Sequence, residues 1–300
     1  MSANDTFEGT EEIAPGLHPL ALLGRNHTHE VLLAWDDTLL TSVAVKLLLP
    51  DRAADPAARS SLANEAAALT TLQHPSLPRC FSAVLDGPRP HLVMELVEGP
   101  RLSTLLRRQG LLGIEQALPL ALQLCAALHY MAARDMVHLD VKPKNVIMAP
   151  PPRLIDLSIA RRLSAARATT HPVGTDRYMA PEQCGTGDHA SIGPPTDIWG
   201  LGATLFEAVN GEPPFPEGDP GGVGSQRFPQ LASRPRPMDA HVPEAVSTPL
   251  TAALERRPEH RPTAAEIVSA LGPIAEVTPP RLFMGRFRVN AWRTARQGSP

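Results

Sequence analysis

The chain has 300 residues, 43% of them hydrophobic and 4% aromatic, with a formal net charge of −3 at pH 7. This length suffices for one large domain or two lobes, and the apolar content excludes an intrinsically disordered chain. The balanced charge provides no general attraction to nucleic acids or membranes, and no apolar run reaches the ~18 residues that a transmembrane helix needs. The three cysteines show no metal-ligand spacing, which predicts a reduced, cytoplasmic location.

Strands are predicted in the first third of the chain, after a tail at 1–16 that is expected to be disordered. Apolar runs between turn residues predict strands at 31–36, 41–50, 79–87 and 90–99. Between the second and third of these strands, Pro56 opens a segment of helical periodicity, so residues 56–72 are expected to form a helix.

The remainder of the chain is predicted to be mainly helical. Helical spacing of apolar residues predicts helices at 115–134, 196–211 and 263–271. Residues 212–237 are dense in Pro and Gly, which predicts a long loop. A strand-rich part followed by a helix-rich part indicates an α+β protein with two lobes of unequal size.

Lys46 stands within the apolar sequence VAVKLLLP, where an ammonium group must reach water or pair with a carboxylate. A lysine on an edge strand is one interpretation. In the following helix, however, Glu65 shares a face with Leu62 and Leu69 and therefore points toward the sheet. Since a buried carboxylate needs a cation, Lys46 and Glu65 are predicted to pair.

The sequence HLDVKPKNVIM places Asp140, Lys142 and Asn145 within six residues, and Pro143 excludes a helix interior. A carboxylate that accepts a hydroxyl proton, an amide oxygen that binds a cation and an ammonium that neutralises phosphate suit phosphoryl transfer. Asp156 follows an apolar pair, as a ligand at a strand end would. Taken singly, each of these fragments also fits an ordinary turn.

These residues occur in order with three further motifs, VGTDRYMAPEQ, TDIWGLG and EHRPTAAEI. Together they resemble the eukaryotic-type (Hanks-type) Ser/Thr protein kinases, and more closely their bacterial branch, from about Leu22 to Leu271. The resemblance implies a two-lobed protein-kinase-like fold over 17–272. A small antiparallel β-sheet lobe with one helix would cover 17–97, and a larger, mainly helical lobe 98–272.

The same resemblance implies a phosphotransferase. It would move the γ-phosphoryl of ATP to Ser or Thr hydroxyls of protein substrates, with possible autophosphorylation, and would use Mg²⁺, or alternatively Mn²⁺. The implied catalytic residues are Lys46, Glu65, Asp140 and Lys142. The implied metal ligands are Asn145 and Asp156. The implied nucleotide contacts are Leu23, Gly24, Asn26, His29, Val31, Ala44, Lys46, Met94, Glu95 and Val97.

Three further roles follow from the resemblance. Met94 would be the gatekeeper at the start of the hinge that receives adenine. Glu182 would form an ion pair with Arg261, and Asp197 would brace the catalytic loop through backbone amides.

Two positions outside the opening loop depart from the family pattern. Leu139 replaces the arginine that precedes the catalytic Asp and binds a phosphate on the activation segment, so activity is expected to depend little on phosphorylation of Thr169 or Thr170. Arg161 and Arg162 offer a substitute clamp for such a phosphate. The second departure is Ser158, which replaces a flexible glycine, so a less mobile segment with a working metal site is expected. Such departures favour an alternative function, a pseudokinase that binds nucleotide or partners without transferring phosphate.

The loop GRNHTHEV, Gly24–Val31, is the third departure, since it retains one of the three family glycines. Asn26 and His29 stand in glycine positions, and Asn is the residue that best tolerates positive φ. His29 would either obstruct the approach to phosphates or donate a hydrogen bond to them. A metal site at His27 and His29 is the less favoured third reading, because two ligands fall short of what Zn²⁺ needs.

Residues 273–300 form a basic tail in which five Arg lie between 281 and 296, interleaved with aromatic residues. This tail is expected to dock a partner, the protein's own acidic domain or an anionic surface, or else to be solvated or packed on the larger lobe. No nucleic-acid partner and no transmembrane segment are expected.

Overall fold

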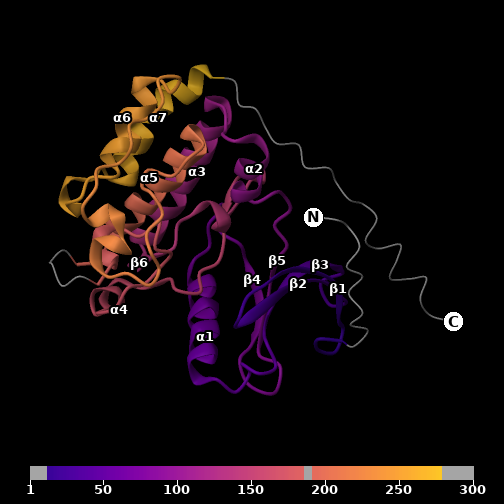
Figure 1. The fold of residues 1–300 in the computed structure, drawn as a ribbon. Coiled ribbons are helices and arrows are strands. Elements are labelled where there is room, and N and C mark those ends of the chain that lie inside the picture. Colours follow the sequence, from indigo (N-terminus) through magenta and orange to yellow (C-terminus); the bar gives the residue numbers. More distant parts are fainter. Residues whose placement is uncertain (1–11, 186–190, 279–300) are drawn as a thin grey trace. The chain divides into compact units, whose positions relative to one another are not determined.

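A computed structural model describes residues 12–185 and 191–278 (Figure 1). The described chain divides into two compact units. The first contains the residues up to Thr70 together with Pro78–Glu98, and the second contains Thr71–Leu77 and the residues from Gly99 onward. The first unit holds a β-sheet with one helix and the second is mainly helical, which confirms the two-lobed α+β fold.

The sheet of the first unit has five antiparallel strands in the order β1-β2-β3-β5-β4. Their bounds are β1 Leu17–Arg25, β2 His29–Asp36, β3 Thr41–Leu48, β4 Cys80–Val84 and β5 His91–Glu95. The four strands predicted from the sequence are confirmed, whereas β1 was not predicted. Pro19 interrupts its pattern, and an edge strand tolerates both this proline and the two register shifts that β1 contains.

One face of this sheet forms a hydrophobic core. Leu32, Val45 and Val93 lie opposite one another on neighbouring strands, point to the same face and are at most 3% exposed. Ile13 belongs to the same cluster and is 4% exposed. The expected disordered tail at 1–16 is therefore too long by at least residues 12–16, which the structure describes as part of this unit.

Helix α1, Pro56–Thr71, completes the first unit close to its predicted bounds. Proline suits its first position, where the missing amide hydrogen has no helical acceptor. Its buried residues are Ala58, Leu62, Glu65, Ala66, Ala68 and Leu69, so the face predicted from the sequence is confirmed, with one carboxylate among apolar side chains.

The second unit is built around α3, Ile114–Ala132, which packs against α5, Pro194–Asn210, and α7, Ala264–Val277. These three helices were predicted, although α7 extends five residues past the expected end of the lobe at 272. The helices that were not predicted are α2 Leu102–Gln109, α4 Leu163–Arg167 and α6 Glu244–Ala252. They are short or interrupted by proline, so hydrophobic periodicity gives them little signal.

Two small antiparallel pairs accompany the helices in the second unit. They are β6 Met136–Val137 with β9 Arg161–Arg162, and β7 Val146–Ile147 with β8 Arg153–Leu154. The predicted loop at 212–237 contains two single turns of 3₁₀-helix, η3 Gly224–Gln226 and η4 Pro229–Leu231.

Helix α5 approaches its neighbours closely at two glycines. A Cβ atom on Gly200 would lie 3.0 Å from the Val141 Cβ, and one on Gly202 would lie 2.8 Å from the Ala253 Cβ. The motif TDIWGLG therefore has a packing reason, because only glycine lets the helix backbone lie this near to the chain around Val141.

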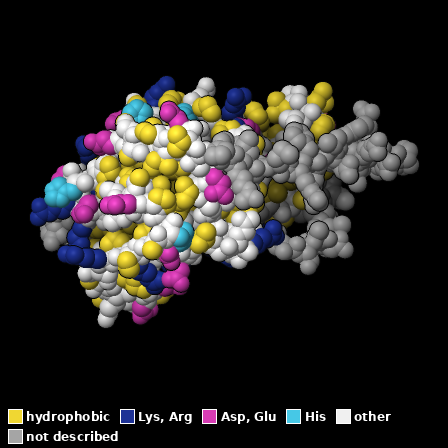
Figure 2. Space-filling view, turned by 90° about the horizontal axis from the view of Figure 1, so that it is seen from above, with side chains coloured by type: hydrophobic (Ala, Val, Ile, Leu, Met, Phe, Trp, Pro, Cys, Tyr) yellow, Lys and Arg dark blue, Asp and Glu magenta, His cyan; other side chains and the backbone are white. Residues whose placement is uncertain are grey.

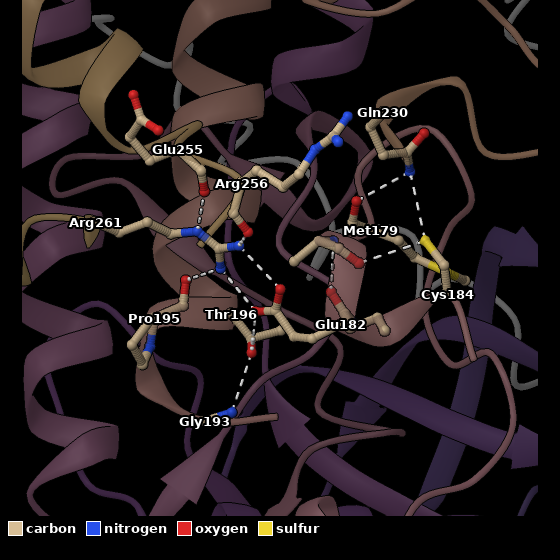
Figure 3. A network of polar contacts seen from close by, with 12 residues as sticks. Met179, Glu182, Cys184, Gly193, Pro195, Thr196, Gln230, Glu255, Arg256 and Arg261 are labelled. Carbon is tan, nitrogen blue, oxygen red and sulfur yellow. Dashed lines mark hydrogen bonds and ion pairs between the residues drawn. The ribbon is translucent and has the colours of Figure 1, made fainter. Parts of the chain in front are cut away.

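A buried ion pair joins two distant segments of the second unit (Figure 3). The Arg261 guanidinium donates to both carboxylate oxygens of Glu182, at 2.7 and 2.9 Å, and both side chains are at most 1% exposed. Arg261 also donates to backbone carbonyls, including that of Pro195, and Thr196 donates to Glu182. The expected Glu182–Arg261 pair is therefore present, and every charged group in it has several partners.

On the face drawn in Figure 2, basic and acidic side chains are interspersed among hydrophobic ones. Within the described ranges, no helix has both the length and the apolar character that crossing a membrane would need. The basic segment 281–296 lies outside the described residues.

Removing one partner of the buried pair should destabilise the second unit strongly. Arg261→Met leaves Glu182 buried without its cation, and we expect a loss of about 3–5 kcal/mol in the free energy of unfolding, measured by urea denaturation. The matched control is Arg177→Met, since Arg177 pairs with the exposed Glu217 at 3.3 Å. This change should lower the free energy of unfolding by less than about 1 kcal/mol. Equal losses in the two variants would contradict this account.

Candidate active site

Lys46 and Glu65 form a buried ion pair within the first unit. The Lys46 Nζ lies 2.5 Å from the Glu65 Oε2, and the two residues are 4% and 2% exposed. Strand β3 supplies the cation and helix α1 supplies the carboxylate, as the apolar setting of each residue predicted. The pair helps to fix the direction of the lysine side chain, because a buried ammonium is stabilised by a buried carboxylate at this distance.

The residues expected around the nucleotide share one face of the sheet. In the strand register, Val31 lies opposite Lys46, and Ala44 lies opposite Met94. Residues opposite each other in antiparallel strands point to the same side, so these side chains lie on the face that does not carry the core cluster. The structure thus brings this part of the predicted set together.

The remaining predicted nucleotide contacts lie at the ends of strands in the same unit. Strand β5 ends at Glu95, whose amide donates to the Arg79 carbonyl at 2.9 Å, and Val97 follows two residues later. Leu23, near the end of β1, is 41% exposed, and Gly24 lies opposite Val31.

The loop between β1 and β2 is a tight hairpin with its own ion pair. Arg25 and Glu30 lie opposite each other, and the guanidinium donates to the Glu30 Oε2 at 2.7 and 3.1 Å. The Thr28 carbonyl accepts from the Leu49 amide at 3.0 Å, which ties the tip to the end of β3. The sequence interpretation did not include the Arg25–Glu30 pair, although opposite charges on both sides of a turn are a usable signal.

Asn26 closes this hairpin in a way that the sequence interpretation had wrong. Its Oδ1 accepts from the amides of Thr28 and His29, both at 2.8 Å, and its own amide donates to the His29 carbonyl at 2.9 Å. Asn26 is not among the non-glycine residues with positive φ, and Gly24 is not among the glycines with positive φ. Asn26 therefore serves as a hydrogen-bond acceptor for the turn rather than as a substitute for a glycine backbone.

A cluster of polar side chains surrounds Asp140 in the second unit. The Lys142 Nζ donates to the Asp140 Oδ2 at 2.6 Å, and the Asn145 Nδ2 donates to the same oxygen at 3.0 Å. The Thr175 hydroxyl donates to the Asp140 Oδ1 at 2.7 Å and accepts from Lys142 at 2.6 Å. The three residues of HLDVKPKN that suggested phosphoryl transfer are therefore in contact, with Thr175 as a fourth member.

Asp197 of α5 holds the chain that leads into this cluster. Its two carboxylate oxygens accept from the amides of His138 and Leu139, at 2.7 and 2.8 Å. Burial raises the pKa of the Asp197 carboxyl, while the two amide donors act in the opposite direction. Leu139 has a φ of 68°, a conformation that is rare for a non-glycine residue and that these bonds help to maintain.

Asp156 follows β8 and also has a positive φ, of 68°. The amide of Ile155 donates to the Asn145 carbonyl at 2.8 Å, which aligns the stretches that carry the two expected metal ligands. Leu157 is fully buried and anchors the chain after the aspartate in the apolar interior.

The loop at 212–237 braces the segment from Thr175 to Cys184. Arg227 forms a bidentate pair with Asp176, at 2.7 and 3.2 Å. The Gln230 Nε2 donates to the Asp176 carbonyl at 2.7 Å. It also donates to the Met179 carbonyl at 3.0 Å (Figure 3). Sequence reasoning missed these contacts because an uncharged amide in a loop rich in proline and glycine has no characteristic pattern.

The donor set of Asn145 and Asp156 fits Mg²⁺. The Asn145 Nδ2 donates to the Asp140 backbone carbonyl and side chain, so the amide is oriented with its oxygen as the atom for a cation. Mg²⁺ binds proteins through few oxygen ligands together with waters and substrate phosphates. Among the described residues, no group of three or more His, Cys, Asp and Glu could hold a metal ion, so the reading of His27 and His29 as a metal site gains no further ligand.

Comparison with known proteins agrees with this geometry. The family model described as "Protein kinase domain" matches residues 17–271. The serine/threonine-protein kinase PknB of Mycobacterium leprae is 31% identical over an alignment of 269 residues that covers 86% of this chain and 43% of that protein. The serine/threonine-protein kinase PkaA of Streptomyces coelicolor is 34% identical over 242 residues, covering 78% of this chain and 43% of that protein.

The chain thus spans less than half the length of these two curated relatives. The serine/threonine-protein kinase PknA of Mycobacterium tuberculosis is 33% identical over 237 residues, with 54% of that protein covered. The match of the family model over most of the chain, with bacterial serine/threonine-protein kinases as relatives, shows that the chain belongs to the protein kinase domain family as a Hanks-type member.

Proposed function

We propose that this chain is an ATP- and Mg²⁺-dependent protein serine/threonine kinase. One observation carries the proposal: the Asp140 Oδ1 accepts a hydrogen bond from a threonine hydroxyl at 2.7 Å, while Lys142 and Asn145 hold its other oxygen. The Thr175 hydroxyl makes the contact with this carboxylate that an alcohol makes with a general base. A Ser or Thr hydroxyl of a protein substrate is the corresponding group in the reaction.

Catalysis then consists of positioning and neutralisation of charge. The substrate oxygen forms a bond to the γ-phosphorus of ATP as the bond to the β-phosphate oxygen breaks, ADP leaves, and the hydroxyl proton passes to Asp140. Lys142 stabilises the charge on the transferred group, and Lys46, held by Glu65, stabilises the α- and β-phosphates. Mg²⁺, bound by Asn145 and Asp156, supplies electrostatic stabilisation when present.

We assign the adenosine end of ATP to the sheet face of the first unit. Met94, Glu95 and Val97 receive adenine through their backbone, and Leu23, Val31 and Ala44 supply apolar contacts. The dependence on ATP supports a cytoplasmic location for this part of the protein, and the protein itself is one candidate substrate.

The alternative function is a pseudokinase that binds nucleotide or a partner protein. The observation that favours it is the hairpin tip, where the Asn26 side chain already occupies two backbone amides. The cluster at Asp140 opposes it, since an inactive relative has no need to keep a carboxylate, an ammonium and an amide in this arrangement.

The decisive variant is Asp140→Asn, measured by transfer of radiolabelled phosphate from ATP to the protein itself and to a basic protein substrate. Loss of the proton acceptor should lower kcat by about 10²- to 10⁴-fold, with the thermal midpoint close to that of the wild type. The matched control is Asp86→Asn, the same change at an exposed position. Wild-type protein that transfers no label with either Mg²⁺ or Mn²⁺ would favour the pseudokinase.

Leu139 suggests how the activation segment is held without a phosphate clamp. Its side chain is 3% exposed and packs with Val137, Ala166, Val173 and Ile192. The Gln183 Nε2 donates to the carbonyls of Leu139 and Val173, at 2.8 and 2.7 Å. Apolar packing and an amide bridge thus do what an arginine and a phosphate do in the family pattern. Arg161, which donates to the Thr169 hydroxyl at 3.2 Å, contributes a further contact.

The Thr169→Ala, Thr170→Ala double variant should therefore keep kcat within about threefold of the wild type, because no phosphate is needed to order the segment. Leu139→Ala is the counterpart: it opens a cavity in the cluster and should cost about 2–5 kcal/mol of stability together with most of the activity. Steady-state kinetics and urea denaturation give both quantities. A tenfold or larger loss in the threonine variant would contradict the apolar clamp.

A further inference from the structure

The hairpin at Gly24–Val31 would cover the phosphates of ATP. An inference about this hairpin therefore rests on the proposed function and adds to it how the phosphates are held. Loops that cover phosphates do so with backbone amides, which act as donors to the phosphate oxygens. The donors in question here are the amides at the tip, between Asn26 and His29.

Most of these donors are already engaged within the hairpin. The amides of Thr28 and His29 both donate to the Asn26 Oδ1 at 2.8 Å, and the Asn26 amide donates to the His29 carbonyl. An amide oxygen with a partial negative charge thus stands where a phosphate oxygen would have to bind. A phosphate can use these amides only by displacing the Asn26 side chain.

Three further contacts hold the hairpin in this form. The Arg25–Glu30 pair closes its base, with Glu30 only 8% exposed, and the Leu49 amide donates to the Thr28 carbonyl. The Asn26 Nδ2 also lies 3.4 Å from the His29 Nε2. No residue of the turn has a positive φ, so the hairpin needs no glycine to adopt this shape.

We propose that Asn26 is an internal cap that occupies the phosphate-binding amides of the hairpin and thereby sets the affinity of this protein for ATP. The adenosine part of ATP then provides most of the binding energy, and the phosphates contribute little through the hairpin. This explains how the chain can dispense with two family glycines: the tip is a self-contained turn rather than an open cradle.

The test measures equilibrium binding by calorimetry. The ligands are ATP with Mg²⁺ and adenosine, which lacks phosphates, and the proteins are the wild type and Asn26 variants. Asn26→Ala removes the cap without adding backbone freedom and should tighten ATP binding by about tenfold, as expected for two recovered charge-assisted hydrogen bonds at a solvated tip. Adenosine should bind equally well to both proteins. Asn26→Gly should match the Ala variant or exceed it.

The matched control is Asn26→Asp, which keeps the acceptor oxygen and adds a negative charge, and should bind ATP more weakly than the wild type while binding adenosine unchanged. The readout is the ratio of the dissociation constant for ATP to that for adenosine, measured for each variant. An unchanged ratio in Asn26→Ala, or an equal gain in the Ala and Asp variants, would overturn the cap. Failure of adenosine and ATP to bind any variant would overturn the proposed function and the cap with it, whereas adenosine binding with an unchanged ratio overturns the cap alone.

Discussion

The geometry of the Asp140 cluster depends on the carboxylate of Asp197, which accepts the amide hydrogens of His138 and Leu139. The chain around Asp140 cannot be regular secondary structure, since Leu139 has a positive φ and Pro143 lacks an amide hydrogen. Without an outside acceptor the two amides would be buried and unbonded, at a cost of about 1–3 kcal/mol each. Gly200 of α5 lets the helix lie close to Val141, near enough for Asp197 to provide this acceptor.

Next to this anchor, the chain has uncharged contacts at Leu139, where the family pattern has an arginine. Leu139 packs into an apolar cluster, and Gln183 bridges its carbonyl to that of Val173. Gln230 and Arg227 hold the next stretch from the loop at 212–237. Such contacts are present whenever the chain is folded. They therefore favour an activation segment that is ordered without phosphorylation.

In the first unit, the hairpin between β1 and β2 likewise satisfies its hydrogen bonds with groups of its own. Side-chain acceptors and an ion pair complete its hydrogen bonds, where an open loop would leave backbone amides for a ligand. The buried pair of Lys46 and Glu65 uses other side chains, from β3 and α1, and Lys46 lies opposite Val31 at the end of the hairpin. In the function that we propose, the Lys46 cation and the hairpin tip would make two distinct contributions to nucleotide binding.

The sequence by itself determined the features that depend on local spacing or on a charge in an apolar setting. It predicted four strands of the sheet, the buried face of α1, the pairing of Lys46 with Glu65, and the proximity of Asp140, Lys142 and Asn145. These follow from the period of a helix or strand and from the high cost of an unpaired buried charge. The Glu182–Arg261 pair and the amide acceptor role of Asp197 came from the family resemblance.

Only the tertiary structure decided the contacts of neutral polar groups between segments far apart in the chain. Thr175 reaches Asp140 across 35 positions, and Gln230 reaches Met179 across 51. It also decided that Asn26 accepts hydrogen bonds instead of adopting a positive φ, and that Ile13 joins the core. The physical reason is that hydrophobic periodicity specifies which face of an element is buried, whereas the partner of an individual amide or hydroxyl depends on distances set by the packing of all the elements.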